Sequence, residues 1–413
     1  YITVQSDVTV SEKPLALLTL KLNTSTQRPF AVVADGRLFP WVGGAVAAVW
    51  LVADGAKIGS EQVISWQAED AHDPVQHSFS LVGIANASTA ASVQLWAQSL
   101  TKGATFRVGA GSGAGGLPLP DGAHAVVSAL TQDSPPVTPS PPVWSGPPCI
   151  LPMTLVVNAS VDVGSDGAVV ALSSGRAFLS GPQGDAMWAL VVDGNPHIVN
   201  NESTHSDNDI CFCAEAGNAP MMTQALFTGL SPGGHTVSLS ATAEPWDGRV
   251  NPVTYTVGAG TAVVALTGLP VTGRAVLTTA VDNPLDYVCV ATSSGWPGCP
   301  PAGQHTVLAS ANFTVPAGHS GNFAFLSKTL VQADSSDAGG SVSLQLFVDG
   351  SAVGSVGVQE LKPPSTISTR TISASWVSSG LSTGPHTVEA VVVANGSFIH
   401  LCCVKDLPIV WFG

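Results

Sequence analysis

The chain has 413 residues, of which 45% are hydrophobic and 10% are charged, and its formal net charge is −14. The high hydrophobic content argues against intrinsic disorder. The scarcity of Glu, Lys and Arg argues against amphipathic helices, which carry these residues on their wet faces. The acidic balance excludes nucleic acid as a partner, because a phosphate backbone would be repelled. We therefore expect an all-β fold.

No apolar run is long enough to cross a membrane as a helix. The longest, residues 45–53, is about half of the roughly 20 residues that a spanning helix needs. The chain begins with Tyr1, and no signal-like apolar segment follows. We expect either that a leader has been removed or that the chain is part of a longer product.

Short alternating segments run along the whole chain. Leu18, Leu20 and Leu22 alternate with polar residues, the period of a half-buried strand. Similar runs follow at short intervals with turn residues between them, as in a sandwich or barrel. Between Gln132 and Cys149 the composition changes to a Pro-rich run, which is typical of a semi-rigid spacer.

We predict three tandem antiparallel β-sandwich domains of the jelly-roll or Ig-like type. Their ranges are 1–131, 151–282 and 303–413, separated by a Pro-rich linker at 132–150 and a Cys/Pro-rich joint at 283–302. We expect each domain to have its own core and the three to be strung end to end.

A repeated hairpin supports this division. Asp54-Gly55, Asp193-Gly194 and Asp349-Gly350 each follow an apolar strand, and Asp-Gly favours a two-residue turn because both residues tolerate positive φ. A valine of a later strand follows the hairpin Gly after 38, 43 and 38 residues, and the hairpins themselves lie 139 and 156 residues apart. A fixed spacing at a domain-sized period indicates duplicated modules.

The pattern V-D-G-x-x-x-G-S, with G-x-H-T-V about 40 residues later and a closing apolar strand, resembles two known families. One is the tandem jelly-roll modules of phage and viral fibres and spikes, related in shape to the C1q/TNF-like fold. The other is the Ig-like modules of bacterial surface adhesins. The period of about 140 residues is long for an Ig-like unit of ~100 residues, which favours the jelly roll. Either resemblance implies a surface-exposed, non-catalytic building block or adhesin. A fainter likeness is to algal secreted glycoproteins, through the Ser-Pro-Pro segment and the sequons.

The cysteines and the sequons are the two features of the sequence that bear on secretion. Cys289 and Cys299 flank a Gly/Pro turn and predict a disulfide, whereas the seven cysteines together match no zinc spacing. N-x-S/T sequons are more frequent than chance in a Ser/Thr-rich chain would give, which favours a secreted, glycosylated product. The six sequon residues are Asn23, Asn86, Asn158, Asn201, Asn312 and Asn395.

The pattern Gly-x-His-(Thr or Ala)-Val occurs four times, with histidines at 124, 235, 305 and 386. We interpret these histidines as strand-start residues that bond a turn carbonyl. Convergence on a metal ion is the alternative, but the copies lie in separate modules or on different strands.

The loops after the first two hairpins are the better metal candidates. Carboxylates at i and i+2 point the same way on an extended chain and suit Ca²⁺. An ordinary solvated loop is the alternative, because the third module has only Glu360 and Lys362 in this place. We therefore predict no cofactor other than Ca²⁺ at these loops. The candidate ligands are Asp70, His72 and Asp73 (with Glu69 and His77) and His205, Asp207 and Asp209 (with Glu202).

We expect no enzymatic activity. The G-x-G-x-x-G run at 111–116 is followed by Leu-Pro-Leu-Pro and not by the helix that this motif requires. No nucleophile with its base is visible, although carboxylates from distant strands could still form a glycosidase pair. Trp144, Trp246 and Trp296 lie in Pro/Gly loops, where they could stack on a sugar or anchor a protein interface. The tryptophans of alternating strands, such as Trp50, are interpreted as core.

The first functional hypothesis is a non-enzymatic structural or receptor-binding component of a virus or phage particle, such as a fibre, spike or capsid-decoration protein. The alternative is a secreted cell-surface or appendage glycoprotein, and the third is a carbohydrate-binding module. The expected partners are other copies of the chain or other proteins of the assembly, with a cell-surface glycan as a further option. The expected location is extracellular or on the virion surface.

Overall fold

A computed structural model shows an all-β protein. In the described residues there is no helix, and the sheets are antiparallel, which confirms the predicted fold class. In this part of the chain no helix has the length and hydrophobicity needed to span a membrane. The described residues are 2–4, 8–21, 30–40, 45–65, 77–85, 92–108, 125–131, 144–146, 154–180, 184–194, 210–214, 217–245, 254–257, 261–269, 272–275, 288–292, 301, 303–333, 340–361, 368–378, 380–396, 398–401 and 409–413.

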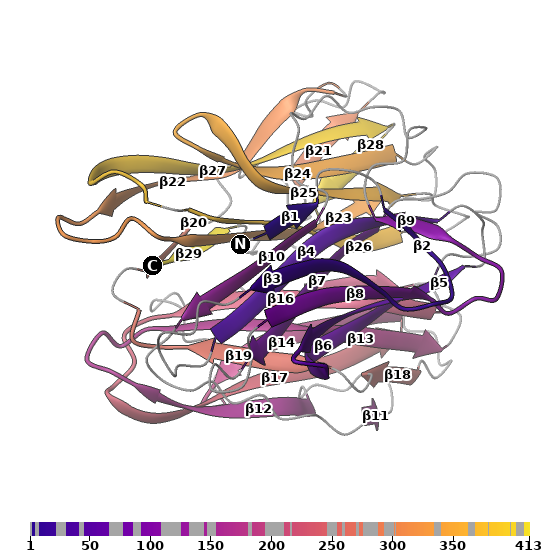
Figure 1. The fold of residues 1–413 in the computed structure, drawn as a ribbon, viewed down its shortest axis with the longest axis horizontal. Helices are drawn as coiled ribbons and strands as arrows, with labels where there is room; N and C mark the ends of the chain where they lie inside the picture. The colour runs from indigo at the N-terminus through magenta and orange to yellow at the C-terminus, as the bar shows by residue number, and fades with distance from the viewer. Residues whose placement is uncertain are drawn as a thin grey trace.

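The first pair of sheets forms the first sandwich (Figure 1). A four-stranded sheet has the order β3-β8-β5-β6, and a second sheet has the order β1-β10-β4-β9-β2 with β7 also paired to β4. The strands are β1 (Ile2–Val4), β2 (Val8–Val10), β3 (Leu15–Lys21), β4 (Phe30–Pro40), β5 (Val46–Ala53), β6 (Ala56–Ser65), β7 (His77–Ala85), β8 (Ser92–Ser99), β9 (Phe106–Val108) and β10 (Ala125–Thr131).

The second sandwich repeats this plan. Its four-stranded sheet has the order β12-β17-β14-β15, and its other sheet has the order β11-β18-β13-β16 with β19 also paired to β13. The strands are β11 (Trp144–Gly146), β12 (Thr154–Val163), β13 (Val169–Ser180), β14 (Gly184–Val192), β15 (Ile210–Ala214), β16 (Gly217–Phe227), β17 (Gly233–Pro245), β18 (Thr254–Val257) and β19 (Ala262–Leu266).

The third sandwich has a four-stranded sheet β22-β27-β24-β25 and a sheet β20-β29-β23-β28-β21 with β26 also paired to β23. Strand β20 lies within the range predicted for the second domain but pairs with β29 of the third sandwich. Strand β11 lies within the predicted linker, 132–150, but pairs with β18 of the second sandwich. The predicted domain boundaries stay predictions. The strands are β20 (Thr272–Ala275), β21 (Val288–Thr292), β22 (His305–Val315), β23 (Ala324–Ala333), β24 (Gly340–Val348), β25 (Ser351–Leu361), β26 (Ser368–Val377), β27 (Gly384–Gly396), β28 (Phe398–Leu401) and β29 (Ile409–Phe412).

The three predicted Asp-Gly turns are present. Asp54, Asp193 and Asp349 have φ of 44°, 52° and 50°, and each following Gly also has positive φ. This is the left-handed backbone that a type I′ hairpin turn requires at both central residues. The first turn connects β5 to β6, the second follows β14, and the third connects β24 to β25. The turns therefore occupy equivalent places in the three four-stranded sheets, which are called outer sheets below.

Alternation places the apolar side chains between the two sheets of a sandwich. In the third sandwich Leu344 and Leu346 are 0% exposed and belong to the same core cluster as Phe325 of the opposite sheet. In the first sandwich Val49 and Leu51 likewise share a core cluster with Leu81 of the opposite sheet. The predicted half-buried hairpin strands therefore supply the cores.

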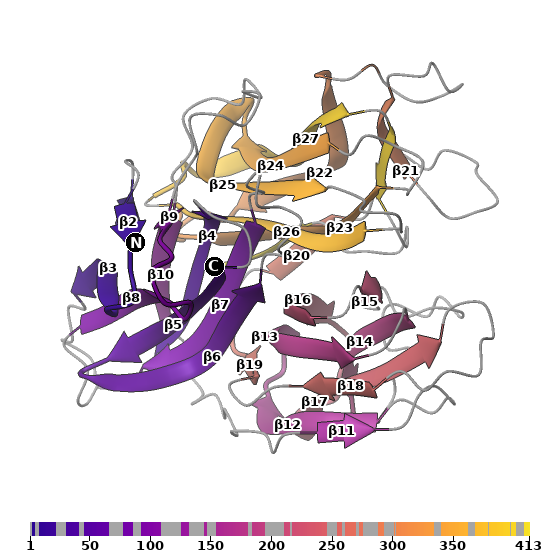
Figure 2. The ribbon, with the colours of Figure 1, turned by 90° about the vertical axis from the view of Figure 1, so that its right-hand side faces the viewer.

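The sandwiches are not strung end to end, and that expectation was wrong. Their other sheets, called central sheets below, share one further apolar cluster, to which Val33, Leu172 and Leu326 of the three sandwiches all belong. Figure 2 shows the three sandwiches around this centre. The physical reason is that the central strands are apolar on both faces: in β4, Val32 faces its own core while Ala31 and Val33 face the shared centre.

The contacts around the centre form a closed ring. Strand β6, at the edge of the first outer sheet, packs on β13 and β16 of the second sandwich. The equivalent strand β15 packs on β26 of the third sandwich, and β25 packs on β4 and β7 of the first. One glutamine side chain spans each interface: Gln62 Nε2 donates to Ser174 Oγ (3.1 Å), Gln224 Nε2 donates to Leu326 O (3.3 Å), and Gln359 Nε2 lies 2.9 Å from His77 Nδ1. Head-to-tail contacts that close after three steps are those of a cyclic trimer, here within one chain.

The Gly-Ser pair of the V-D-G-x-x-x-G-S pattern closes the corner between the two sheets of a sandwich. Ser60 Oγ accepts a hydrogen bond from Val82 N (2.9 Å) and donates one to Val82 O (3.1 Å). Ser355 Oγ bonds N and O of Ser375 in the same way, at 2.8 and 3.3 Å. The preceding glycine, Gly59 or Gly354, has positive φ and lies against the same strand.

Candidate functional site

The structure does not test the predicted metal ligands. Asp70, His72, Asp73, His205, Asp207 and Asp209 lie outside the described residues, as do Glu69 and Glu202, so Ca²⁺ binding stays a prediction. His77 is the first residue of β7 and is buried at the interface with the third sandwich. Among the residues described, no three His, Cys, Asp or Glu side chains are grouped as a metal site would require.

The other predicted sites are partly visible. Cys289 lies in β21, but Cys299 is outside the described residues, so the disulfide is untested. Trp144 begins β11, and Trp246 and Trp296 are not described.

Two of the six sequons lie on described, solvent-exposed positions of the outer sheets. Asn158 on β12 and Asn312 on β22 are exposed, and so are the hydroxyl residues of their sequons, Ser160 and Thr314. Asn395 lies near the end of β27, but its side chain is not described. Asn23, Asn86 and Asn201 lie outside the described residues.

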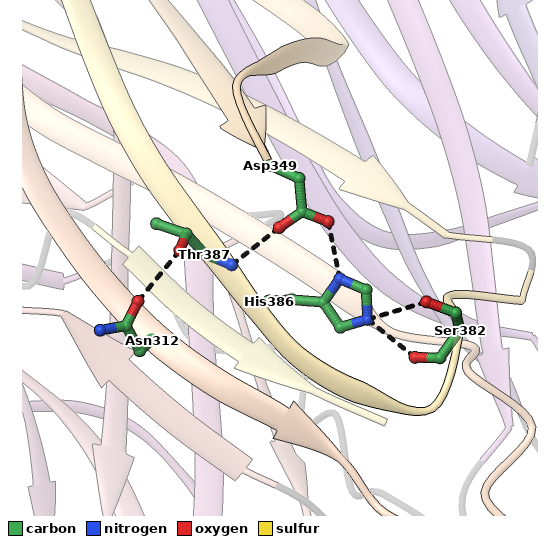
Figure 3. Close-up of polar contacts among 5 residues, drawn as sticks. All are labelled: Asn312, Asp349, Ser382, His386 and Thr387. Atoms are coloured by element: carbon green, nitrogen blue, oxygen red, sulfur yellow. Dashed lines mark hydrogen bonds and ion pairs between the residues drawn. The ribbon is translucent and has the colours of Figure 1, made fainter.

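The histidines of two G-x-H-T-V motifs have a specific partner in the hairpin aspartate. His386 Nδ1 lies 2.7 Å from Asp349 Oδ2, and Nε2 lies 2.7 Å from the carbonyl oxygen of Ser382 (Figure 3). The other carboxylate oxygen, Oδ1, accepts a hydrogen bond from Thr387 N at 2.9 Å. The side chain of Asp349 thus ties the hairpin turn to the start of β27.

The second sandwich repeats this arrangement atom for atom. His235 Nδ1 lies 2.6 Å from Asp193 Oδ2, His235 Nε2 lies 2.7 Å from Ser231 O, and Thr236 N donates to Asp193 Oδ1 at 2.8 Å. The first sandwich has Ala91-Ser92-Val93 in place of His-Thr-Val and therefore lacks the histidine. His305 of a further motif copy is exposed at the start of β22, and His124 is not described.

The electrostatics of both pairs favour the charged forms. Hydrogen bonding to Asp349 and to the Ser382 carbonyl raises the pKa of His386, and hydrogen bonding from His386 and from Thr387 N lowers the pKa of Asp349. In the second sandwich the Ser231 carbonyl and Asp193 raise the pKa of His235, while Thr236 N and His235 lower that of Asp193. Because both ring nitrogens of each histidine face an oxygen acceptor, the doubly protonated imidazolium satisfies both contacts.

Ser382, His386 and Asp349 have the residue types of a catalytic triad but not its geometry. Ser382 Oγ lies 3.5 Å from Nε2, whereas the carbonyl oxygen of the same residue lies at 2.7 Å. A general base needs an unprotonated nitrogen within about 3.2 Å of the hydroxyl. Here Nε2 donates to a carbonyl and cannot take a proton from the serine. The arrangement fixes a turn.

The predicted role of the histidine as a turn-binding, strand-start residue agrees with these contacts, but the aspartate was missed. The available signal was the spacing, since Asp349 precedes His386 by 37 residues and Asp193 precedes His235 by 42. His386 also stacks on Phe313 of β22, with ring centroids 5.5 Å apart.

A second feature missed from the sequence is an aromatic pair on the outward face of the first outer sheet. Trp50 and Trp96 stack with ring centroids 6.4 Å apart, and Lys57 lies over the Trp50 ring at 4.4 Å. Lys57 also pairs with Glu61 at 2.9 Å. Trp50 is buried, as predicted, but it belongs to a small separate cluster and not to the core between the sheets.

The comparisons with known proteins give no family. No family model and no curated protein sequence matches the chain. Among solved structures, the chain is similar to the tandem CBM22-1–CBM22-2 domains of Xyn10C from Paenibacillus barcinonensis, with 11% identity over 60% of this chain and 83% of that chain and a TM-score of 0.20. It is also similar to the infectious bursal disease virus Gx strain structure (9% identity, 96% and 80% covered, TM-score 0.23) and to a Paenibacillus xanthan lyase (12% identity, 92% and 34% covered, TM-score 0.20). The functional argument therefore rests on the chain's own residues.

Proposed function

We propose that this chain is a non-enzymatic structural building block of an extracellular assembly, in the first place a fibre, spike or capsid component of a virus or phage particle. The observation that carries the proposal is the closed ring of three sandwiches, each interface spanned by one glutamine. A ring closed within one chain has the shape of a trimer without depending on the concentration of free subunits.

The polar groups of the described sites serve the fold. Both Asp–His pairs use their ring nitrogens to hold turns, and Ser60 and Ser355 use their hydroxyls to close sandwich corners. The scarcity of charge over the whole chain, 10% of residues, suits packing against neighbouring copies or other proteins of an assembly.

The test is the assembly state of the purified full-length chain. We expect ordered particles, filaments or lattices in electron micrographs, with a scattering mass that rises with protein concentration. The variant Q62A/Q224A/Q359A serves as a control, because loosening the ring should reduce assembly. A wild-type chain that stays a monomer at high concentration contradicts the proposal.

A secreted cell-surface glycoprotein is the second candidate, and one observation favours it. Asn158 and Asn312 stand exposed on strands with the hydroxyl residues of their sequons beside them. Secretion from a eukaryotic cell line followed by intact-mass measurement tests it: added glycan mass supports this candidate, and an unmodified secreted chain contradicts it.

A further inference from the structure

Among the described strands, the first strand of each outer sheet is an edge strand with a neighbour on one side. Strands β3, β12 and β22 are the terminal strands in the orders β3-β8-β5-β6, β12-β17-β14-β15 and β22-β27-β24-β25. A terminal strand presents unpaired backbone groups that can pair with another chain, and natural proteins protect such edges with charges, prolines or bulges.

Charge gives these three edges little protection. Strand β22 has no Asp, Glu, Lys or Arg, β12 has one aspartate, and β3 has one lysine. Two leucines of these strands are exposed, Leu15 by 38% and Leu155 by 53%. Each edge strand does carry a register shift, at Ala16/Leu18, Leu155/Val157 and Val307/Ala309, but the pairing resumes beyond it. The stretch after the shift is a regular edge that carries one charged residue in β3 (Lys21), one in β12 (Asp162) and none in β22.

Two of the sequons lie along that stretch. Asn158 follows the shift in β12, and Asn312 follows the shift in β22. Asn23 comes two residues after the last residue of β3. Two of the earliest sequons of the three sandwiches, Asn158 and Asn312, therefore lie on the equivalent edge strands β12 and β22. Asn23 lies outside the described residues, as do Asn86 and Asn201, and Asn395 lies on β27.

The amide of Asn312 is held in an orientation that suits a glycan. Its Oδ1 accepts a hydrogen bond from Thr387 Oγ1 at 3.0 Å. The nitrogen, to which an N-linked glycan attaches, points away from Thr387 (Figure 3). Asn158 and Asn312 are both exposed, and their +2 hydroxyl residues Ser160 and Thr314 are exposed on the same face, since residues i and i+2 of a strand point the same way.

We propose that Asn158 and Asn312 carry N-linked glycans whose role is to shield the open edges of the outer sheets from edge-to-edge pairing. This inference rests on the second candidate function, the secreted glycoprotein. A glycan is bulky and hydrated, so on an edge strand it prevents pairing with another chain, as charged residues do in other proteins.

The experiment compares the full-length wild type, secreted from a eukaryotic cell line, with the variants Ser160→Ala and Thr314→Ala. Each variant removes a sequon but leaves the asparagine in place. Ser310→Ala is the matched control, because Ser310 is exposed on β22 and belongs to no sequon. Glycopeptide mass spectrometry gives the occupancy of each site, and size-exclusion chromatography with light scattering gives the self-associated fraction.

We expect occupancy at Asn158 and Asn312 in the wild type, and a self-associated fraction at least threefold higher in the double variant S160A/T314A but unchanged in S310A. If the double variant is not secreted, trimming the wild-type glycans enzymatically to a single sugar on the folded protein should give the same rise. Occupied sites without a rise in self-association overturn the shielding role and leave the glycoprotein candidate standing. Empty sites on a secreted chain overturn the inference, and a chain without any glycan overturns the glycoprotein candidate as well.

Discussion

His386 and Asp349 bind each other across the third outer sheet, with 2.7 Å between Nδ1 and Oδ2, and His235 and Asp193 repeat the contact in the second at 2.6 Å. The histidine side chains are almost fully covered, with 7% and 9% exposed, whereas the aspartates are about half exposed. The partial exposure weakens each ion pair through solvent screening. The two pairs nevertheless make stability depend on pH in a defined way.

The sign follows from the pKa directions. The raised pKa of His386 and His235 gives stability that is complete below the unfolded value of about 6.5 and is lost as the pH rises through the folded value. The lowered pKa of the aspartates gives stability that is complete above about 3.9 and is lost as the pH falls through the folded value. The two pairs thus contribute most between about pH 4 and pH 6.5.

The variant H235Q/H386Q tests this. We expect it to lose about 1 kcal/mol of unfolding free energy for each pair at pH 5.5 and less at pH 8.5, because the stability that a raised histidine pKa provides declines as the pH rises. Denaturant titrations at the two pH values measure the difference. The exposed His305→Gln is the control and should leave the pH dependence unchanged. An equal loss at both pH values would show that the imidazolium form is not what stabilises the turns.

Asp35 gives a second pH prediction. It is 2% exposed on β4 and lines a small cavity between the three sandwiches, together with Val33, Leu172 and Leu326. Burial raises the pKa of Asp35, and the nearby hydroxyl groups of Ser375, Ser80 and Ser373 oppose this effect only in part, since Asp35 Oδ2 has no hydrogen-bond partner among the described residues. Stability from this group is present below about pH 3.9 and is lost as the pH rises through the raised value.

The variant Asp35→Asn cannot ionise, so it removes the loss of stability at high pH while keeping the shape of the side chain. We expect it to raise the unfolding free energy at pH 7.5 by about 1–3 kcal/mol, the usual cost of a poorly satisfied buried polar group, and to have little effect near pH 3.5. Thermal unfolding at the two pH values checks this. A destabilised variant at pH 7.5 would mean that the ionised carboxylate is needed at the junction.

The glycine at the sandwich corner gives a prediction about packing. A Cβ at Gly354 would lie under 3.0 Å from the carbonyl oxygen of Ser375, while a Cβ at Gly350 would meet nothing within 4 Å, although both residues have positive φ. Both variants should lose roughly 1 kcal/mol of unfolding free energy through backbone strain at positive φ. We expect Gly354→Ala to lose considerably more than that, because its Cβ also collides with Ser375. Denaturant midpoints of the two variants measure the difference. Equal midpoints would contradict the close approach of the two sheets at this corner.

Leu326 tests the shared centre. It is 6% exposed and belongs to the cluster between the sandwiches and to neither of the separate cores described for the first and third. If the centre is closely packed, Leu326→Ala should cost about 2–5 kcal/mol, as for a core leucine. Leu100→Ala, at a position that is 50% exposed, should cost little. A small effect at Leu326 would mean that the sandwiches touch only loosely.

The sequence predicted what depends on local rules. Asp-Gly turns and period-2 alternation placed the three hairpins and their core residues, because turn chemistry and the pleat of a strand act over a few residues. Gly354-Ser355 was seen as a pattern, but its role needed Ser375, which is 20 residues away on the neighbouring sheet. The hairpin aspartate and the later histidine are likewise joined only by the fold.

The ring arrangement could not be predicted for a related reason. Residues 31–34 are consecutively apolar or small, which indicates a strand buried on both faces but does not say what covers the second face. Glutamines 62, 224 and 359 look like ordinary surface residues in the sequence. Their role as links follows only from the positions of partners that lie 102 to 282 residues away.

The most direct test of the central claim, that three sandwiches are packed as one body around a shared centre, is to cut the chain between the first two. A protease site is inserted at residues 136–139 of the Pro-rich run, and the chain is cleaved after folding. We expect the two fragments to elute together and to unfold in a single transition close to that of the uncut protein, because the ring interfaces remain. Fragments that separate and unfold independently would show that the first sandwich is an independent domain and would contradict the claim.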